Sequence, residues 1–387
     1  MSDLRTPASP TGPGAASDEA PSTATAAANA SSAQASGGRS LLPRSTLLRH
    51  LVVLVVSAVL AVLLLESTSL GFNAQLGYVA FYAIAAGGLT VLTGLNGQIS
   101  LGHGALMAIG GYTTALLLDV EEPLPLPVVF LIAVLATSVV GAIVGVAAAR
   151  LHGPYLAGAT LALAVGLPGL ALTFPQQLGG EQGLTVSAPD RPDWFVEGIR
   201  TLSGNPASGV KWIAYIAVAC LLVTYFLLAN LMRSRIGRTW RAVRDQEVAA
   251  ELAGISLGAW RVLAFVVSAA AAGLAGGVLA LVVRLTSPTT FTIVLSLALL
   301  TGIVIGGLGS LLGALIGAAL LVLLPRLLRD AGESLDMDAA QAAEISYVVY
   351  GVLLVLVILF APAGLVGSIR LGVLRAKAKR ATSRAGR

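Results

Sequence analysis

Long apolar stretches alternate with short polar ones along most of this chain. The ten apolar segments cover residues 47–65, 74–94, 97–118, 126–149, 155–174, 212–231, 260–283, 291–306, 308–325 and 345–361. An α-helix rises about 1.5 Å per residue, so even the shorter segments approach the about 30 Å thickness of a hydrocarbon core. The pattern predicts an all-α, polytopic membrane protein with about ten transmembrane helices. The third, eighth and ninth segments are Gly-rich and could be broken or re-entrant.

Composition supports this interpretation. Of the 387 residues, 56% are hydrophobic and only 11% are charged. A soluble core of this size does not need so many apolar runs. The net charge is +5, but the basic residues lie mostly in short loops and a tail, where they set membrane orientation; no nucleic acid partner is expected. The single cysteine, Cys220, excludes a disulfide framework and a cysteine metal site.

The two ends of the chain differ from the middle. Residues 1–45 are rich in Ala, Ser, Thr, Pro and Gly and predict a disordered cytoplasmic tail. Residues 46–367 form the predicted transmembrane domain, and residues 368–387 form a basic cytoplasmic tail. The first apolar run is long enough to span a bilayer, so it is not a signal peptide.

Loop charges predict the orientation. Arginines before the first segment and the basic tail after the last place both termini in the cytoplasm. The loop 232–260 then faces the cytoplasm, and the loop 175–210 faces the outside. Acids gather in the outside loops: Glu66, Asp119, Glu121, Glu122, Glu181, Asp190 and Asp193. Six basic residues also fall outside, and they weaken this asymmetry without reversing it.

Ionisable groups are nearly absent from the apolar segments. A charge at the bilayer centre costs about 2.5–3.5 kcal/mol, and of the ionisable residues only His103 sits well inside a segment. This argues against a proton-coupled carrier. Asn96, Gln98, Ser100 and His103 are candidates for lining a translocation path. The alternative is hydrogen bonding that only fixes helix packing, and this alternative is favoured for His103 taken alone.

Other chemistry has little support in the sequence. No metal site is expected, because His50 and His152 fall near the membrane surface without a Cys or acid cluster. No nucleophile–base pair suggests an enzyme. The chain contains no Gly-Lys pair and therefore no phosphate-binding GxxxxGK loop. Energy for uphill transport would have to come from another subunit.

Small residues recur at intervals of four. The predicted helix-packing glycines are Gly273, Gly277, Gly302, Gly306, Gly309, Gly313 and Gly317. Residues four apart lie on one face of a helix, and small ones there let two helix backbones approach closely. Ordinary membrane packing explains them better than a special sliding movement.

A charged segment interrupts the apolar pattern after residue 231. Five arginines, at 233, 235, 238, 241 and 244, run into Asp245, Glu247 and Glu251. On a helix over 244–254, Arg244, Glu247 and Glu251 would share an ionic face. Val248, Leu252 and Ile255 would form an adjoining apolar stripe, and Gly254 would end the helix. Such a surface suits docking into a groove of a soluble partner. The alternative, a helix lying flat on the inner leaflet, fits the acids less well.

The sequence resembles the permease subunit of branched-chain amino acid ABC importers, the LivM type. The resemblance covers roughly residues 74–367. It is carried by GLNGQISLGHGALMAIGGYTTALL (94–117), RLHGPYLAGATLALA (150–164), LGGEQGLT (178–185), the stretch 236–280, and IGGLGSLLGALIGAALLVLLP (305–325).

The resemblance implies that residues 244–254 couple the permease to an ATPase. Glu247, Ala249, Ala250 and Gly254 match an E-x-A-A-x-x-x-G variant of the family's Glu-Ala-Ala loop, which sits in a cleft of the ATPase subunit. The implied coupling residues are Arg244, Asp245, Glu247, Ala249, Ala250, Glu251 and Gly254. This chain would bind no cofactor, and ATP would be hydrolysed by partner subunits.

The implied partners are a second, LivH-type permease, two ATP-binding subunits and an extracytoplasmic solute-binding protein, in the lipid of a prokaryotic plasma membrane. The implied substrates are leucine, isoleucine and valine. Similar permeases serve urea or other amino-acid-like or carboxylate solutes, and a stand-alone carrier or channel is the alternative from another class. One departure is Ala361-Pro362-Ala363-Gly364, where the family often has R-P-R-G.

Overall fold

The computed structural model describes residues 46–120, 122–151, 154–204, 207–335, 337–360 and 364–369. The predicted N-terminal tail, His152, residues 361–363 and residues 370–387 of the basic tail lie outside these ranges. The described part is almost entirely helical, as the apolar pattern predicts, with one two-stranded antiparallel pairing.

The elements follow one another in a regular order. The helices are α2 (Thr46–Ser67), α3 (Leu70–Leu89), the π-helix η1 (Thr90–Leu95), α4 (His103–Leu118), α5 (Leu126–Ala149), α6 (Pro154–Thr173), α7 (Pro175–Leu178), α8 (Asp193–Ser203), α9 (Gly209–Arg233), α10 (Arg235–Asp245), α11 (Glu247–Leu252), α12 (Leu257–Val283), the 3-10 helix η2 (Pro288–Phe291), α13 (Ile293–Gly306), α14 (Leu311–Glu333) and α15 (Ala339–Phe360). Strand β1 (Leu184–Thr185) pairs with β2 (Leu285–Thr286).

Each of the ten predicted apolar segments overlaps a helix. Within the described residues, seven helices are long and apolar enough to cross a membrane: α2, α3 with η1, α5, α6, α9, α12 and α14. The helices α4 and α13 are apolar but shorter, and α15 has 22 residues. The chain is therefore a multi-pass membrane protein.

Two of the three uncertain segments are broken. Helix α4 begins at His103 rather than near residue 97, and residues 97–102 are not helical. Helix α13 has only 14 residues and follows a 3-10 turn. At about 1.5 Å per residue its length is about 21 Å, too short for a full crossing. The ninth segment is different, because α14 continues without a break to Glu333, beyond the predicted limit of residue 325.

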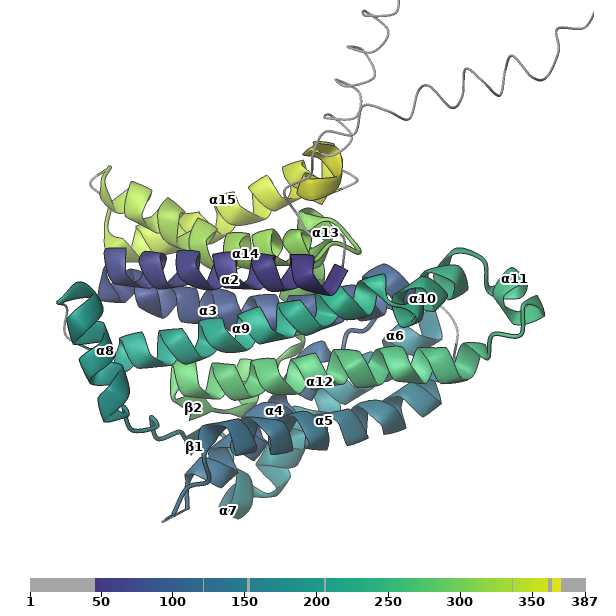
Figure 1. Ribbon diagram of the computed structural model, residues 1–387, viewed down its shortest axis with the longest axis horizontal. Coiled ribbons are helices and arrows are strands. Elements are labelled where there is room, and N and C mark those ends of the chain that lie inside the picture. The colour runs from purple at the N-terminus through teal and green to yellow at the C-terminus, as the bar shows by residue number, and fades with distance from the viewer. Residues whose placement is uncertain are drawn as a thin grey trace, which may run out of the picture. The chain divides into compact units, whose positions relative to one another are not determined.

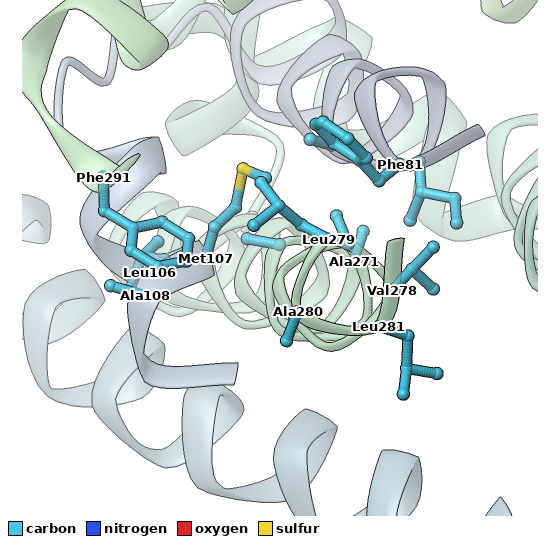
Figure 2. Close-up of a cluster of buried hydrophobic side chains, with 14 of the residues drawn as sticks. Phe81, Leu106, Met107, Ala108, Ala271, Val278, Leu279, Ala280, Leu281 and Phe291 are labelled. Carbon is cyan, nitrogen blue, oxygen red and sulfur yellow. The ribbon is translucent and has the colours of Figure 1, made fainter. Parts of the chain in front are cut away.

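Helices α3 and α12 form the centre of the bundle. In the most apolar 18-residue stretch of α3 with η1, 78% of the residues are buried, and in that of α12, 67% are buried. The corresponding fraction for α2 is 6%. Helix α12 packs along α3, α4 and α5. Figure 2 shows Phe81 of α3, Met107 of α4 and Leu279 of α12 within this core. Most large apolar side chains of α2 remain exposed, as expected for a helix that contacts lipid, and Leu65 is the buried one among them.

The predicted glycine contacts are present in the α13–α14 hairpin. Gly302 lies against Gly317, and Gly306 lies against Gly313. A β-carbon at Gly306, Gly313 or Gly317 would collide with the backbone of the facing glycine, and one at Gly302 would collide with the Leu321 side chain. The predicted face of Gly309, Gly313 and Gly317 is wrong in one respect. Helix α14 starts at Leu311, and Gly309 belongs to the preceding turn, with φ of +79°.

Successive helices carry the chain back and forth between two ends. Figure 1 shows α10 and α11 at one end, and α8 with β1 and β2 at the other. The ends of α5, α9 and α15 lie at the α10–α11 end, together with the start of α2. The contacts of Gly94 with Arg244 and Gly309 bring the end of η1 and the turn after α13 to the same end.

Gly317→Ala should destabilise the bundle by about 1–3 kcal/mol, because the added methyl collides with the Gly302 carbonyl. Gly166→Ala on α6 is the matched control, since nothing lies within 4 Å of its β-carbon position. Denaturant unfolding of the purified chain in detergent measures both. Equal stability of the two variants would contradict the close α13–α14 packing.

Candidate functional site

The charged segment between α9 and α12 forms two helices rather than one. Helix α10 ends at Asp245, and α11 begins at Glu247 after a bend at Gln246, which has φ of −153° and ψ of 88°. The predicted single helix over 244–254 is therefore wrong. Arg244 and Asp245 close α10, while Glu247 lies in the first turn of α11, where its negative charge suits the helix dipole.

Helix α10 is anchored in the bundle through Trp240. This side chain is fully buried, and its indole N–H donates to the Trp260 carbonyl at 2.9 Å. Trp240 belongs to a hydrophobic cluster that also includes Val91, Leu92 and Leu95 of η1. The arginines at 233, 235 and 238 are exposed instead. The amphipathic α10 thus lies with its apolar side on η1 and α12.

Helix α11 presents an apolar pair to the outside. Val248 is 70% exposed and Leu252 is 85% exposed, and their four-residue spacing puts them on one face. Ala250 is buried, while Ala249 and Glu251 are exposed. Two exposed apolar side chains on a short helix with acids beside them are typical of a docking surface.

The predicted stop at Gly254 is confirmed. Gly254 has φ of +81°, a conformation that favours glycine. The Ile255 N–H donates to the Ala250 carbonyl at 3.0 Å, and the Gly254 N–H donates to the Glu251 carbonyl at 2.9 Å. These two bonds are the Schellman ending of a helix, and they direct the chain from α11 into α12.

Two arginines connect this segment to the interior. The Arg244 guanidinium donates to the Gly94 carbonyl in η1 and pairs with Asp245 at 2.8 Å. Arg261 of α12 pairs with Glu247 at 2.5 Å, and its own carbonyl accepts from the Gln98 amide at 3.4 Å. Both links lead to residues 94–98, where the predicted path residues begin.

The four candidate path residues lie close together in the chain and are all buried. Asn96, Gln98, Ser100 and His103 have at most 5% exposure. The Gln98 amide donates to the Asn96 side-chain oxygen. Nevertheless Asn96 Nδ2, Gln98 Oε1, Ser100 Oγ and His103 Nδ1 lack a hydrogen-bond partner among the described residues. Buried polar atoms without partners cost about 1–3 kcal/mol each.

The stretch 96–102 re-enters the bundle. His103 Nε2 is 3.0 Å from the Ala85 carbonyl of α3, ten residues before the end of η1. At about 1.5 Å per residue, His103 lies about 15 Å from that end. There the Gly104 N–H donates to the Ser296 hydroxyl of α13 at 2.9 Å. The starts of the two short helices, α4 and α13, therefore meet at mid-depth.

The opposite end carries an aromatic cluster and a shielded ion pair. Lys211 of α9 and Glu66 of α2 pair at 2.7 Å with side-chain exposures of 3% and 9%. The Tyr215 hydroxyl donates to Glu66 at 2.8 Å. Phe195 of the amphipathic α8 packs on Trp212, with ring centroids 4.5 Å apart. Aromatic rings at this level are typical of a membrane–water interface.

The described residues hold no group of three or more His, Cys, Asp and Glu side chains suited to a metal ion. His50 Nδ1 instead lies 2.7 Å from the Asn230 side-chain oxygen, between α2 and α9.

Sequence reasoning missed three parts of this arrangement: Trp240, Arg261 and the π-helix η1. A lone Trp within an arginine-rich segment was a usable signal, because the other residues of α10 are largely polar. Nothing in the sequence shows that Arg261 reaches Glu247, or that the helix widens into a π-turn over 90–95. Such π-turns occur often at functional sites.

Fold and site define an all-α, multi-pass membrane protein with a charged helical segment at one end. Comparison of the sequence with known protein families identifies the family. A family model described as "Branched-chain amino acid transport system / permease component" matches residues 73–358. The chain belongs to this family of branched-chain amino acid transport permeases.

Relatives with curated names agree. The high-affinity branched-chain amino acid transport system permease protein LivM of Escherichia coli is 31% identical over 357 residues, covering 87% of this chain and 80% of the relative. LivM of Salmonella typhimurium is 30% identical over 309 residues, covering 75% and 68%. BraD of Pseudomonas aeruginosa is 27% identical over 213 residues, covering 54% and 69%. No solved structure matches the chain.

Trp240→Ala should release α10 from the bundle, because it removes a large buried ring, a change that costs about 3–5 kcal/mol in a packed core. The expected result is faster hydrogen exchange at the amides of residues 235–245, with the amides of α3 unchanged. Trp194→Ala is the control, since Trp194 is 69% exposed. Unchanged exchange in α10 would contradict its anchoring by Trp240.

Proposed function

We propose that this chain is the plasma-membrane permease subunit of an ABC importer for branched-chain amino acids. Separate ATPase subunits would drive it, a second permease would complete the pore, and an extracytoplasmic binding protein would deliver leucine, isoleucine or valine. The observation that carries the proposal is α11, which exposes Val248 and Leu252 while its neighbours contact the buried stretch 94–98. The curated relatives named above support the substrate class.

Charge distribution supports a cytoplasmic position for α11. Among the described residues, the α10–α11 end carries eight arginines and three acids, whereas the opposite end carries eleven acids and six bases. Positively charged loops remain in the cytoplasm during insertion. Both ends of the described chain, Thr46 and residue 369, then also face the cytoplasm, and α8 faces the outside.

Docking of α11 into an ATPase follows from its surface. Burial of a Val or Leu side chain contributes about 1.5–3 kcal/mol, so the exposed pair supplies a useful share of a binding energy. Ala249 beside them allows a close approach, and Glu251 offers a charge for register. Lipid is a poorer partner for this face, because Glu247 and Glu251 would lie against anionic headgroups.

Passage of the substrate would use the broken helices. Non-helical backbone inside a membrane is tolerated where protein or a water-filled cavity surrounds it. Within residues 96–102, Asn96, Gln98 and Ser100 are buried, whereas Gly97 and Ile99 are exposed. The partnerless polar atoms of the buried side chains would be available for new contacts when the stretch moves. The outer loop 175–210, which contains α8, would receive the binding protein.

Val248→Asp with Leu252→Asp should abolish ATPase binding, because two carboxylates would replace the apolar surface that enters the cleft. The measurement is co-purification of the ATPase subunits with the tagged permease, followed by ATP-dependent leucine uptake in proteoliposomes. Both should fall at least about tenfold, since the loss exceeds 1.4 kcal/mol.

The matched control exchanges the two side chains, Val248→Leu with Leu252→Val, and should keep both activities. Leucine uptake by the purified chain without any ATPase would favour a stand-alone carrier instead. Competition by isoleucine and valine but not by urea or benzoate would separate branched-chain amino acids from the other solutes.

A membrane-impermeant maleimide should reach Val248→Cys only from the cytoplasm, and Trp194→Cys only from outside. The background is Cys220→Ala, which removes the single native cysteine. Labelling of intact cells and of inverted vesicles gives the two accessibilities. Labelling of residue 248 in intact cells would refute an ATPase contact at α11.

A further inference from the structure

Residues 94–98 form a junction between the docking segment and the interior. The π-helix η1 ends here, and its final carbonyls have no partner further along the same helix. The Asn96 N–H bonds the Val91 carbonyl, and the Gln98 N–H bonds the Leu92 carbonyl at 3.1 Å. The Gly94 carbonyl takes its donor from another element, the Arg244 guanidinium of α10.

The geometry around Arg244 is specific. Asp245 holds the guanidinium through Nε at 2.9 Å and Nη2 at 2.8 Å, which leaves Nη1 directed at Gly94. The Arg244 stem covers Gly97, where a β-carbon would lie 2.9 Å from Arg244 Cγ. Gly97 has φ of +80°. A cation at the carboxyl end of a helix also suits the helix dipole.

A second link reaches the same place from α11. Glu247 pairs with Arg261 at 2.5 Å, and the Arg261 carbonyl accepts from Gln98. Arg244 and Glu247 lie on either side of the bend at Gln246, so a displacement of α11 pulls on both links. Arg261 is the fifth residue of α12.

We infer that Arg244 caps the carboxyl end of η1 as a positioning residue and transmits the displacement of α11 to the re-entrant stretch 96–102. The inference deepens the proposed function and rests on it. The family resemblance assigned Arg244 and Asp245 to the contact with the ATPase. The inference assigns them instead to the contact with Gly94, with side chains that remain 38% and 59% exposed. Val248 and Leu252 remain the docking residues.

This transmission from α11 through Arg244 to the stretch 96–102, called the relay below, explains why the charged segment is built from two helices. Helix α10 is fixed to η1 by Trp240, so a movement of α11 relative to α10 concentrates at Gln246 and its neighbours. Arg244 is the last arginine before this bend. Asn96 and Gln98, whose Nδ2 and Oε1 atoms have no partner within the described residues, lie two and four residues beyond the capped carbonyl. A small shift at Gly94 therefore changes their surroundings directly.

The experiment compares Arg244→Ala with Arg235→Ala in the complete importer, reconstituted in proteoliposomes with its ATPases, second permease and binding protein. Arg235 carries the same charge at the first position of the same helix and is exposed as Arg244 is, but among the described residues its guanidinium makes no contact like that of Arg244 with Gly94. Three quantities are measured for each variant: ATPase co-purification, the ATP hydrolysis rate, and leucine molecules transported per ATP.

Arg244→Ala should keep its ATPase subunits and hydrolyse ATP, while leucine per ATP falls by about tenfold or more, the effect expected from loss of a hydrogen bond to a charged group. Arg244→Lys should restore part of the yield, because it keeps one donor and the charge. Asp245→Asn should give a smaller defect than Arg244→Ala. Arg235→Ala should match wild type.

Equal leucine per ATP in Arg244→Ala and Arg235→Ala would overturn the relay. Loss of the ATPase in Arg244→Ala would also overturn it, because Arg244 would then belong to the docking surface. Failure of the proposed function has a different signature: no ATPase would co-purify even with the wild-type chain.

A double-mutant cycle tests the same contact independently. Gly97→Ala displaces the Arg244 stem from the opposite side, so it should lower leucine per ATP in the wild-type background and have a smaller effect in Arg244→Ala, which lacks the Cγ and Cδ atoms of that stem. Additive effects in the cycle would contradict the contact.

Discussion

The absence of water inside a bilayer is the constraint on which this structure depends. Every backbone N–H and C=O there must bond within the protein, which is why nearly all described residues are helical. The stretch 97–102 is one exception, and its neighbours make it possible. Thr160 of α6 accepts from the Leu101 N–H at 3.0 Å, and Ser296 of α13 accepts from the Gly104 N–H at 2.9 Å. Helices distant in the sequence thus satisfy one non-helical turn.

Small residues let neighbouring helices pack closely within the bilayer. Apolar side chains gain little by leaving lipid for protein, so helices in a membrane associate mainly through contact area and hydrogen bonds. The Gly302–Gly317 and Gly306–Gly313 contacts bring α13 and α14 together along their backbones. The same close approach places Gly309 beside Gly94, so the α13–α14 turn also borders the junction at the end of η1.

The proposed function depends on a contrast between a rigid and a movable part. Helices α3 and α12 are deeply buried, and Trp240 attaches α10 to η1 and α12. Helix α11 has six residues, and of these the structure buries only Ala250. In the proposed importer, a partner that moves α11 would meet little resistance from α11 itself, and the displacement would pass to the arginines that link it to residues 94–98.

The sequence by itself determined the membrane class, the ten apolar segments, the alternation of their ends, the stop at Gly254 and the polar character of residues 96–103. These features follow from local composition and spacing, because a helix that crosses a bilayer needs about 20 consecutive apolar residues. Only the tertiary structure decided that residues 97–102 leave the helix, that Gln246 divides the charged segment, and that Arg244 contacts Gly94 while Arg261 pairs with Glu247. Each of these depends on partners far away in the chain, such as Thr160, Ser296 and Gly94, and local spacing carries no information about which distant group supplies a missing hydrogen bond.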